Sequence, residues 1–138
     1  MGAIRYMAVA AAGLLLAVPG SAQTRAATGG PFMVFFDWGK PELRRDDGET
    51  LDKVAEAYRA GPGVRLSLTG HADRSGSAAA NRAAGLRRAE TVRAELEKRG
   101  IPRNAMTLAS FGEDRPLVPT EDGVREVQNR RVEIAFEG

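Results

Sequence analysis

The sequence predicts an α/β protein, a two-layer sandwich in which two long helices pack on a mixed four-stranded sheet. Four short segments are either apolar runs or alternate between apolar and polar residues, as strands do. Two longer segments repeat apolar residues at helical spacing. These segments follow one another in the order β-α-β-α-β-(α)-β, which favours two packed layers around one core. The 138 residues correspond to one small domain.

The first strand and the first helix lie in the amino-terminal half of this domain. Residues 33–36 form a short apolar run with β-branched and aromatic side chains, which predicts a buried strand. Asp46 and Glu49 have the spacing of a capping box at a helix start. The helix then continues to Gly61-Pro62-Gly63, where glycine and proline end it. Its core-facing residues are Leu51, Val54, Ala55 and Tyr58.

The second strand and the long helix come next. Residues 64–69 alternate between apolar and polar side chains, which predicts a half-buried strand. Gly70 to Gly76 is predicted to be a loop, and Ser77 to Lys98 a long helix that ends before Gly100. The core face of this helix is predicted to hold Leu86, Ala89, Val92 and Leu96.

The carboxy-terminal part supplies the remaining strands. Residues 106–110 are predicted to be the third strand, and residues 112–119 a loop. Residues 120–128 are expected to hold a short helix. Residues 132–136 alternate between apolar and polar or small side chains, which predicts the last strand.

The amino terminus has the features of a secretory signal peptide. Arg5 is followed by an apolar run of about 12 residues and then by small residues up to Ala22, the order of regions found in such signals. We expect cleavage after Ala22, so that residues 1–22 are the signal peptide, 23–31 a flexible leader and 32–138 the folded domain. An uncleaved signal that stays as a membrane anchor is the alternative. Either way, we expect the domain to be exported.

Composition excludes several classes of function. The chain has 20 basic and 18 acidic residues, and this near balance argues against a nucleic-acid partner, which usually meets a clustered basic excess. It has no cysteine and one histidine, so a thiolate or poly-histidine metal site is excluded. We expect no cofactor and no metal.

Asp73 is the first candidate functional residue. It lies in the loop Gly70-His71-Ala72-Asp73-Arg74-Ser75-Gly76, at the carboxyl end of a predicted strand, where open α/β sheets usually place ligands. A structural alternative stays open, in which Asp73 only caps the loop or the helix. His71 is expected to be a hydrogen-bonding residue of the same loop, because no nucleophile and orienting acid can be placed beside it.

Arg88 is the second candidate, on the long helix. Asn81, Gly85 and Arg88 share one helix face, because seven residues make almost two turns. A glycine in a helix costs about 1 kcal/mol relative to alanine, which makes sense if something approaches the helix closely there. The alternative for Arg88 is an ordinary solvated arginine.

Two further segments carry polar side chains near strand ends. Asn129-Arg130-Arg131 precedes the last strand, and the structural alternative is a pair of exposed bases that discourages edge pairing. Asp37-Trp38 follows the first strand, where a turn with a packed aromatic ring is the simplest reading.

These segments together resemble the OmpA-like peptidoglycan-binding domain, the family of OmpA carboxy-terminal, Pal and MotB-like domains. The resemblance covers about residues 32–138 and lies in four pieces in register. The pieces are Val34-Phe35-Phe36-Asp37, the loop from Gly70 to Gly76, Asn81 with Leu86-Arg87-Arg88-Ala89 and Val92, and Gly112, Pro116 and Gly123-Val124-Arg125 with Asn129-Arg130-Arg131-Val132-Glu133-Ile134.

The resemblance implies a non-catalytic protein that binds the peptide stem of peptidoglycan through meso-diaminopimelate. It places the family's ligand-binding aspartate on Asp73 and its ligand-binding arginine on Arg88, with supporting contacts expected near Asp37, Ala72, Asn81 and Arg130. Asp73 would accept from the ammonium of the ligand, and Arg88 would donate two N–H bonds to its carboxylate. A lysine stem lacks that carboxylate and should bind less well.

The implied location is the periplasm, in association with the cell wall or the outer membrane. Ala72 stands where the family often has threonine and Gly85 where it often has serine, so we expect a lost hydrogen bond at the first position and a looser helix or a wider pocket at the second. These departures motivate an alternative function, a periplasmic scaffold that docks an outer-membrane or motor partner with weak or lost wall binding. A wall hydrolase is the least favoured hypothesis.

Overall fold

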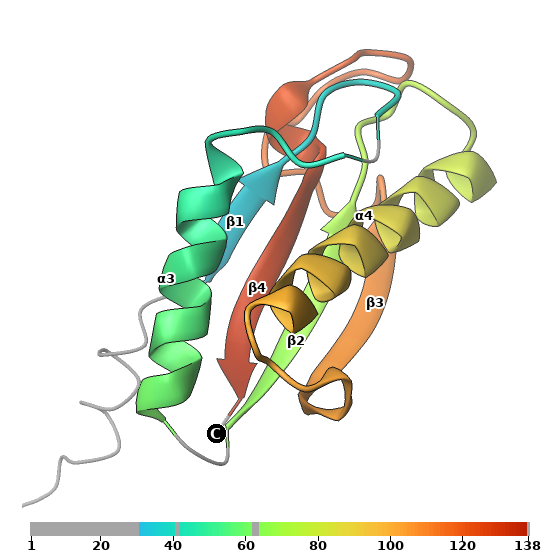
Figure 1. The fold of residues 1–138 in the computed structure, drawn as a ribbon. Helices are drawn as coiled ribbons and strands as arrows, with labels where there is room; N and C mark the ends of the chain where they lie inside the picture. Colours follow the sequence, from blue (N-terminus) through green and yellow to red (C-terminus); the bar gives the residue numbers. More distant parts are fainter. Residues whose placement is uncertain (1–30, 41, 62–63, 138) are drawn as a thin grey trace, which may run out of the picture.

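Four strands and two long helices make up the part of the chain described by the structure, a computed structural model that describes residues 31–40, 42–61 and 64–137 (Figure 1). The predicted signal peptide and the leader up to residue 30 lie outside these residues. The elements are β1 (Phe32–Phe35), α3 (Asp47–Ala60), β2 (Arg65–His71), α4 (Ala78–Lys98), β3 (Met106–Gly112) and β4 (Arg131–Glu137), with short 3-10 turns η3 (Arg103–Ala105) and η4 (Val127–Asn129). The predicted fold class is confirmed.

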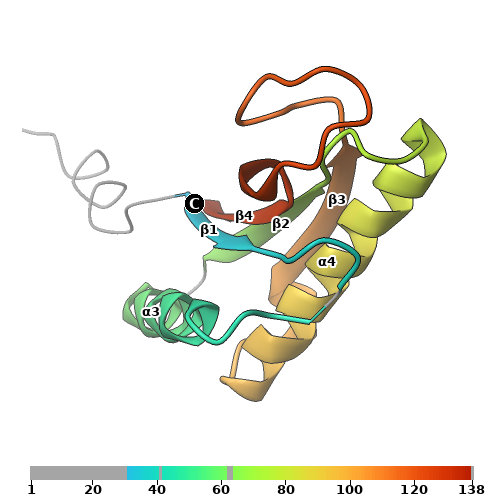
Figure 2. The same cartoon turned by 90° about the horizontal axis from the view of Figure 1, so that it is seen from above.

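The sheet is mixed and its order is β1-β4-β2-β3. The central strand β4 pairs antiparallel with β1 on one side and with β2 on the other, while β2 and β3 run parallel. Parallel strands need a crossover connection, and the long helix α4 supplies it between β2 and β3. Both helices cover the same face of the sheet (Figure 2), which makes the two layers.

The core lies between this face and the helices. In β2, Leu66 and Leu68 are buried whereas Ser67 and Thr69 are only partly covered, as the alternation predicted. Strand β2 also continues through Gly70 and His71, which the sequence had assigned to the loop. The buried core cluster consists of Val34, Phe36, Leu51, Val54, Ala55, Leu66, Leu68, Ala89, Val92, Leu96, Ile101, Ala105, Met106, Val132 and Ile134.

The backbone of α4 touches the backbone of β2 at two glycines. A Cβ on Gly70 would lie 1.8 Å from the carbonyl oxygen of Gly85, and a Cβ on Gly85 would lie 2.4 Å from the Ser110 hydroxyl oxygen. Gly85 therefore turns toward the sheet, and the expectation that it widens a ligand pocket is wrong. The neighbouring Leu86, predicted to be in the core, is 41% exposed because Gly85 occupies the sheet-facing position.

Gly70→Ala should lower the free energy of unfolding by about 2–3 kcal/mol, since the new methyl group would meet backbone atoms that cannot rotate away. Urea denaturation measures the change. Gly48→Ala in α3 is the matched control, because its Cβ would meet only the end of the flexible Arg99 side chain, 3.8 Å away. The control should be neutral or stabilising. An unchanged midpoint for Gly70→Ala would contradict the close approach.

Two predicted local features are wrong. Asp46 stands at the amino terminus of α3 but makes no side-chain capping bond. Its neighbour Asp47 is buried instead and accepts a hydrogen bond from the backbone N–H of Phe35, which links α3 to β1. The predicted helix over residues 120–128 is reduced to the 3-10 turn η4, because the preceding backbone bonds to residues outside the segment. The N–H of Gly123, for example, donates to the carbonyl of Arg74.

Candidate functional site

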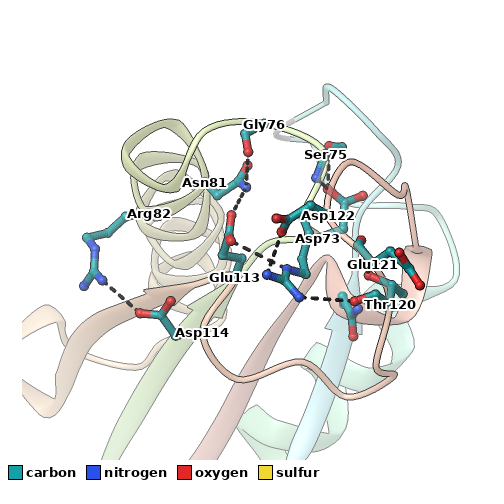
Figure 3. A network of polar contacts seen from close by, with 12 residues as sticks. Asp73, Ser75, Gly76, Asn81, Arg82, Glu113, Asp114, Thr120, Glu121 and Asp122 are labelled. Atoms are coloured by element: carbon teal, nitrogen blue, oxygen red, sulfur yellow. Dashed lines mark hydrogen bonds and ion pairs between the residues drawn. The ribbon is translucent and has the colours of Figure 1, made fainter.

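The polar residues predicted to carry the function meet at one end of the sheet. Residues 72–76, which follow β2, lie here beside the start of α4 and the segment between β3 and β4 (Figure 3). The Ser77 side chain caps α4 by accepting from the N–H of Ala80, so the loop enters the helix in a fixed path. The end of β2, the start of α4 and the return to β4 therefore position the site.

Asp73 is 2% exposed and forms a buried ion pair with Arg130. The Nη1 of Arg130 donates to Oδ2 of Asp73 over 2.6 Å, and its Nε donates to the carbonyl of Phe36 over 2.9 Å. Arg130 thereby ties the loop after β2 to the end of β1. The structural alternative of two exposed bases is wrong, since Arg130 is 7% and Arg131 3% exposed.

All acceptor positions of the Asp73 carboxylate are occupied. Oδ1 accepts from the backbone N–H and the hydroxyl of Ser75, and Oδ2 accepts from Arg130 and from the backbone N–H of Glu126. A carboxylate offers about four lone-pair positions. Burial alone would raise the pKa of Asp73, but the hydrogen bonds from Ser75, Arg130 and Glu126 outweigh it and lower that pKa below its usual value. Asp73 therefore stays ionised and orders the loop.

Arg88 is buried without a carboxylate of its own. It is 7% exposed, its Nη1 donates to the carbonyl of His71 over 3.0 Å, and its guanidinium carbon lies 5.7 Å from the ring centre of Phe36. Burial lowers the pKa of Arg88 to about 10, with the charge of Asp73 raising it and that of Arg130 lowering it, so the side chain remains charged at neutral pH. Within residues 31–40, 42–61 and 64–137, no acidic side chain lies within ion-pair distance of it.

The two arginines and Asp73 leave the site with one uncompensated positive charge. Asp73 pairs with Arg130. Arg88 interacts electrostatically with Asp73, but among the described groups it donates a hydrogen bond only to a backbone carbonyl. A small pocket of about 140 Å³ opens beside Arg88, lined also by Gly39, Lys40, Ala84 and Arg87. A buried guanidinium next to such a pocket favours an anionic ligand.

Asn81 lies on the same face of α4 as Gly85 and Arg88, and all three are buried, as the helical spacing predicted. Its amide nitrogen donates to the Gly76 carbonyl and, over 2.7 Å, to a carboxylate oxygen of Glu113 (Figure 3). The side chain thus orders the loop and does not contact Asp73.

Arg74 contributes a second polar network that the sequence analysis missed. Its Nη2 pairs with Asp122 over 2.6 Å, its Nη1 donates to the Thr120 carbonyl, and its Nε lies 3.6 Å from Glu113. These contacts hold the segment between β3 and β4 against the loop after β2. These partners lie about 40 to 50 positions from Arg74 in the chain, and no local pattern indicates such a pairing.

Two of the predicted supporting residues lie at the edge of the site. The Asp37 side chain is 61% exposed and lies 3.9 Å from Arg44. Ala72 is 4% exposed, and its backbone N–H donates to the carbonyl of Gly112. The half-exposed Trp38 donates from its indole nitrogen to the Ser75 hydroxyl, and the guanidinium of Arg125 is stacked 3.4 Å from its ring centre. Trp38 joins the loop after β1 to the loop after β2.

His71 differs most from its prediction. It lies in β2, is 2% exposed, and neither ring nitrogen has a hydrogen-bond partner among the described residues. Its ring packs against Phe111, and Nε2 lies 4.0 Å from Glu133. Burial and the charge of Arg131 lower the pKa of His71 to about 4, so the ring is neutral at pH 7. The expectation of a hydrogen-bonding loop residue is wrong.

This burial makes stability depend on pH. The unfolded chain protonates His71 near pH 6.5, but the folded protein does so only near pH 4, so stability is lost as the pH falls between these values. Urea denaturation at pH 7.5 and 4.5 should show wild type losing about 2–3 kcal/mol more than His71→Leu. Equal losses in the two proteins would contradict the account.

No metal-ion cluster and no helix able to cross a membrane occur in the part of the chain that the structure describes. Around Arg88, a pocket lies beside a buried cation that has no acidic partner among the described residues. Among the described residues, this is the arrangement best suited to hold a ligand.

Comparison with known proteins identifies the relatives of this fold. Residues 35–130 match the model of the OmpA family. A peptidoglycan-associated lipoprotein of Brucella melitensis is 35% identical over 122 residues, which are 88% of this chain and 72% of that protein. An outer membrane protein of Gluconacetobacter diazotrophicus is 37% identical over 109 residues, covering 75% of this chain but only 29% of that protein.

Solved structures agree with this assignment. The crystal structure of the peptidoglycan-associated lipoprotein from Burkholderia pseudomallei has a TM-score of 0.70 at 27% identity, covering 76% of this chain and 89% of that one. The carboxy-terminal domain of Helicobacter pylori MotB has a TM-score of 0.67 at 22% identity, covering 78% of this chain and 84% of that one, which is a likeness of fold.

Proposed function

The chain belongs to the OmpA family, and on that premise we propose that it is a non-catalytic peptidoglycan-binding protein of the periplasm that helps anchor or organise the cell envelope. The names of its relatives as peptidoglycan-associated lipoproteins support binding to the wall. The proposed signal peptide over residues 1–22 supports export, with residues 23–31 as leader and 32–138 as the binding domain. The outer membrane and the wall are the surfaces with which such a protein would associate.

The proposed ligand group is the diaminopimelate of the stem peptide, and the buried, uncompensated charge of Arg88 is the observation that carries this proposal. The free end of diaminopimelate presents an ammonium and a carboxylate on one carbon. Arg88 would donate to the carboxylate, which supplies the negative charge that the site lacks. A lysine stem offers the ammonium alone and would leave Arg88 uncompensated.

Binding the ammonium requires Asp73 to release one of its donors. The Ser75 hydroxyl is the donor easiest to displace, because it can rotate away from Oδ1 and remain an acceptor for the Trp38 indole. Arg130 is also held by its bond to the Phe36 carbonyl, and Glu126 by the bonds that its carbonyl and carboxylate accept within the turn η4, so both stay on Oδ2. The incoming ammonium would therefore take the place of the Ser75 hydroxyl on Oδ1.

The supporting residues have positioning roles in this proposal. Arg130 fixes the orientation of Asp73, and Asn81 fixes the loop through Gly76. Ala72 acts through its backbone, and Asp37 lies at the rim next to the turn that leads to Lys40. No cofactor or metal enters the proposal.

Titration with stem peptides, followed by NMR, tests the assignment. A diaminopimelate tripeptide should shift the amide signals of residues 72–76 and 84–88 with saturation, and the lysine tripeptide should bind at least about tenfold more weakly, the effect expected when a charged site loses its partner. Ser75→Ala should keep the binding, since it frees Oδ1. Equal affinity for the two peptides, or shifts outside both segments, would overturn the diaminopimelate assignment.

Sedimentation with purified sacculi tests the broader proposal. Wild type should sediment with the sacculi without releasing soluble muropeptides. The scaffold function, in which an outer-membrane or motor partner replaces the wall, rested on the departures at Ala72 and Gly85. Because Gly85 faces the sheet, this motivation is weakened. Failure to sediment, together with a stoichiometric co-purifying protein, would favour the scaffold.

A further inference from the structure

The pocket beside Arg88 carries more positive charge than a single carboxylate needs. Its lining includes Lys40 and Arg87 in addition to Arg88, and among the described residues the rest of the lining is Gly39 and Ala84. No acidic side chain lines it, and neither Lys40 nor Arg87 has an ion-pair partner within the described ranges. Three cations thus face one pocket of about 140 Å³.

The turn after β1 brings Lys40 to this pocket. Gly39 adopts a φ of +71°, a left-handed conformation that glycine reaches without strain, and the N–H of Lys40 donates to the carbonyl of Asp37. The chain therefore turns back toward α4. There, Ala84 lies one turn before Arg88 and its small side chain leaves the space open.

The positive charge of Arg88 is unfavourable in the free protein. Arg87 and Arg130 both contribute positive charge that lowers the pKa of Arg88, in addition to the effect of burial. Such repulsion is relieved when anionic groups bind, so the affinity of the pocket should rise with the number of carboxylates that a ligand brings. The pocket volume equals that of about four to five water molecules, which is enough for the carboxylate group held by Arg88 and a second carboxylate group beside it.

We propose that Lys40 and Arg87 form a second anion subsite, next to Arg88, that binds another free carboxylate of the same stem peptide. This inference rests on the proposed function and refines its ligand: the protein selects stems whose carboxylates are not amidated. Two carboxylates of a stem qualify, that of its carboxyl terminus and the α-carboxylate of its D-glutamate. Both keep the diaminopimelate end free for Arg88 and Asp73.

Three synthetic tripeptides with the same free diaminopimelate end test the proposal. The first, called the diacid, has both the carboxy-terminal carboxylate and the D-glutamate α-carboxylate in addition to that free end. The second has a carboxy-terminal amide, and the third has D-isoglutamine in place of D-glutamate. Calorimetric titration of the purified protein at low ionic strength should show the diacid binding about three- to tenfold more tightly than one of the amides. The amide that loses affinity identifies the carboxylate in the subsite.

Variants separate this subsite from general electrostatic attraction. The Lys40→Met plus Arg87→Met double variant should bind the diacid and the amides alike, while it still prefers diaminopimelate to lysine. The matched control, Lys53→Met plus Arg93→Met, removes the same charge elsewhere and should keep the preference for the diacid. Ala84→Leu, which fills the pocket without a charge change, should also abolish that preference.

Each outcome decides one proposal. Equal binding of all three peptides by wild type, or a diacid preference that survives the Lys40 and Arg87 substitutions, overturns the second subsite and leaves the diaminopimelate site standing. If the control variant loses the preference for the diacid to the same extent, that preference depends only on the net charge of the protein, and the second subsite is overturned as well. If none of the peptides binds, the proposed function itself fails.

Discussion

Replacing Asp73 with alanine should lower the free energy of unfolding by about 3–5 kcal/mol, because it leaves Arg130 buried and unpaired. The same change removes the acceptor for the Ser75 and Glu126 backbone N–H groups, so the loop after β2 and the segment before β4 both lose an anchor. Urea denaturation at pH 7 measures the loss. It is the largest effect on stability that we expect from any single polar substitution at the site.

Two further variants make this expectation specific. Asp122→Ala breaks the exposed ion pair with Arg74 and should cost less than about 1 kcal/mol. Combining Asp73→Ala with Arg130→Met should recover part of the stability, since the unpaired charge is gone. An Asp73→Ala protein as stable as the Asp122→Ala protein would show that the buried pair does not hold the loop.

Arg88→Met should weaken binding of the diaminopimelate tripeptide by about 10- to 100-fold, the range expected when a charge-assisted bond to a carboxylate is lost. Stability should change in the opposite way from Asp73→Ala. Arg88 is a buried cation without a carboxylate partner among the described residues, so its removal relieves a cost and sacrifices one hydrogen bond to the His71 carbonyl. The melting temperature should stay level or rise.

Arg82→Met is the control for this prediction. Arg82 lies on the same helix, is 60% exposed at its side chain and pairs with Asp114 at the surface. The Arg82→Met protein should bind the diaminopimelate tripeptide with the affinity of wild type. Unchanged affinity in Arg88→Met would contradict the assignment of Arg88, and a large loss of stability would contradict the view that it is held for a ligand.

Features of the fold that depend on the local periodicity of apolar residues were predictable from the sequence. The alternation in β2 and β4 and the helical spacing in α4 led to the correct elements, and the same spacing placed Asn81, Gly85 and Arg88 on one buried face. Periodicity shows which side chains share a face. It does not show what lies opposite, which is why Leu86 was assigned to the core that Gly85 faces.

The pairing of charges at the site was not predictable. Asp73 and Arg130 were both named from the sequence, but their pairing joins positions 57 residues apart and depends on β4 lying between β1 and β2. The same holds for Glu113, which meets Asn81 across 32 positions. His71 shows the converse: a polar residue next to glycine suggested a loop, whereas the strand continued and buried it.

The place of β4 has a consequence for biosynthesis. Of the described strands it comes last in the chain, yet it separates β1 from β2 in the sheet, and the residue before it supplies the partner of Asp73. A nascent chain that still lacks this strand has no partner for β1 and no counter-ion for Asp73. Strand β1 and the end of the sheet that holds Asp73 therefore gain their partners together, only once β4 has joined the sheet.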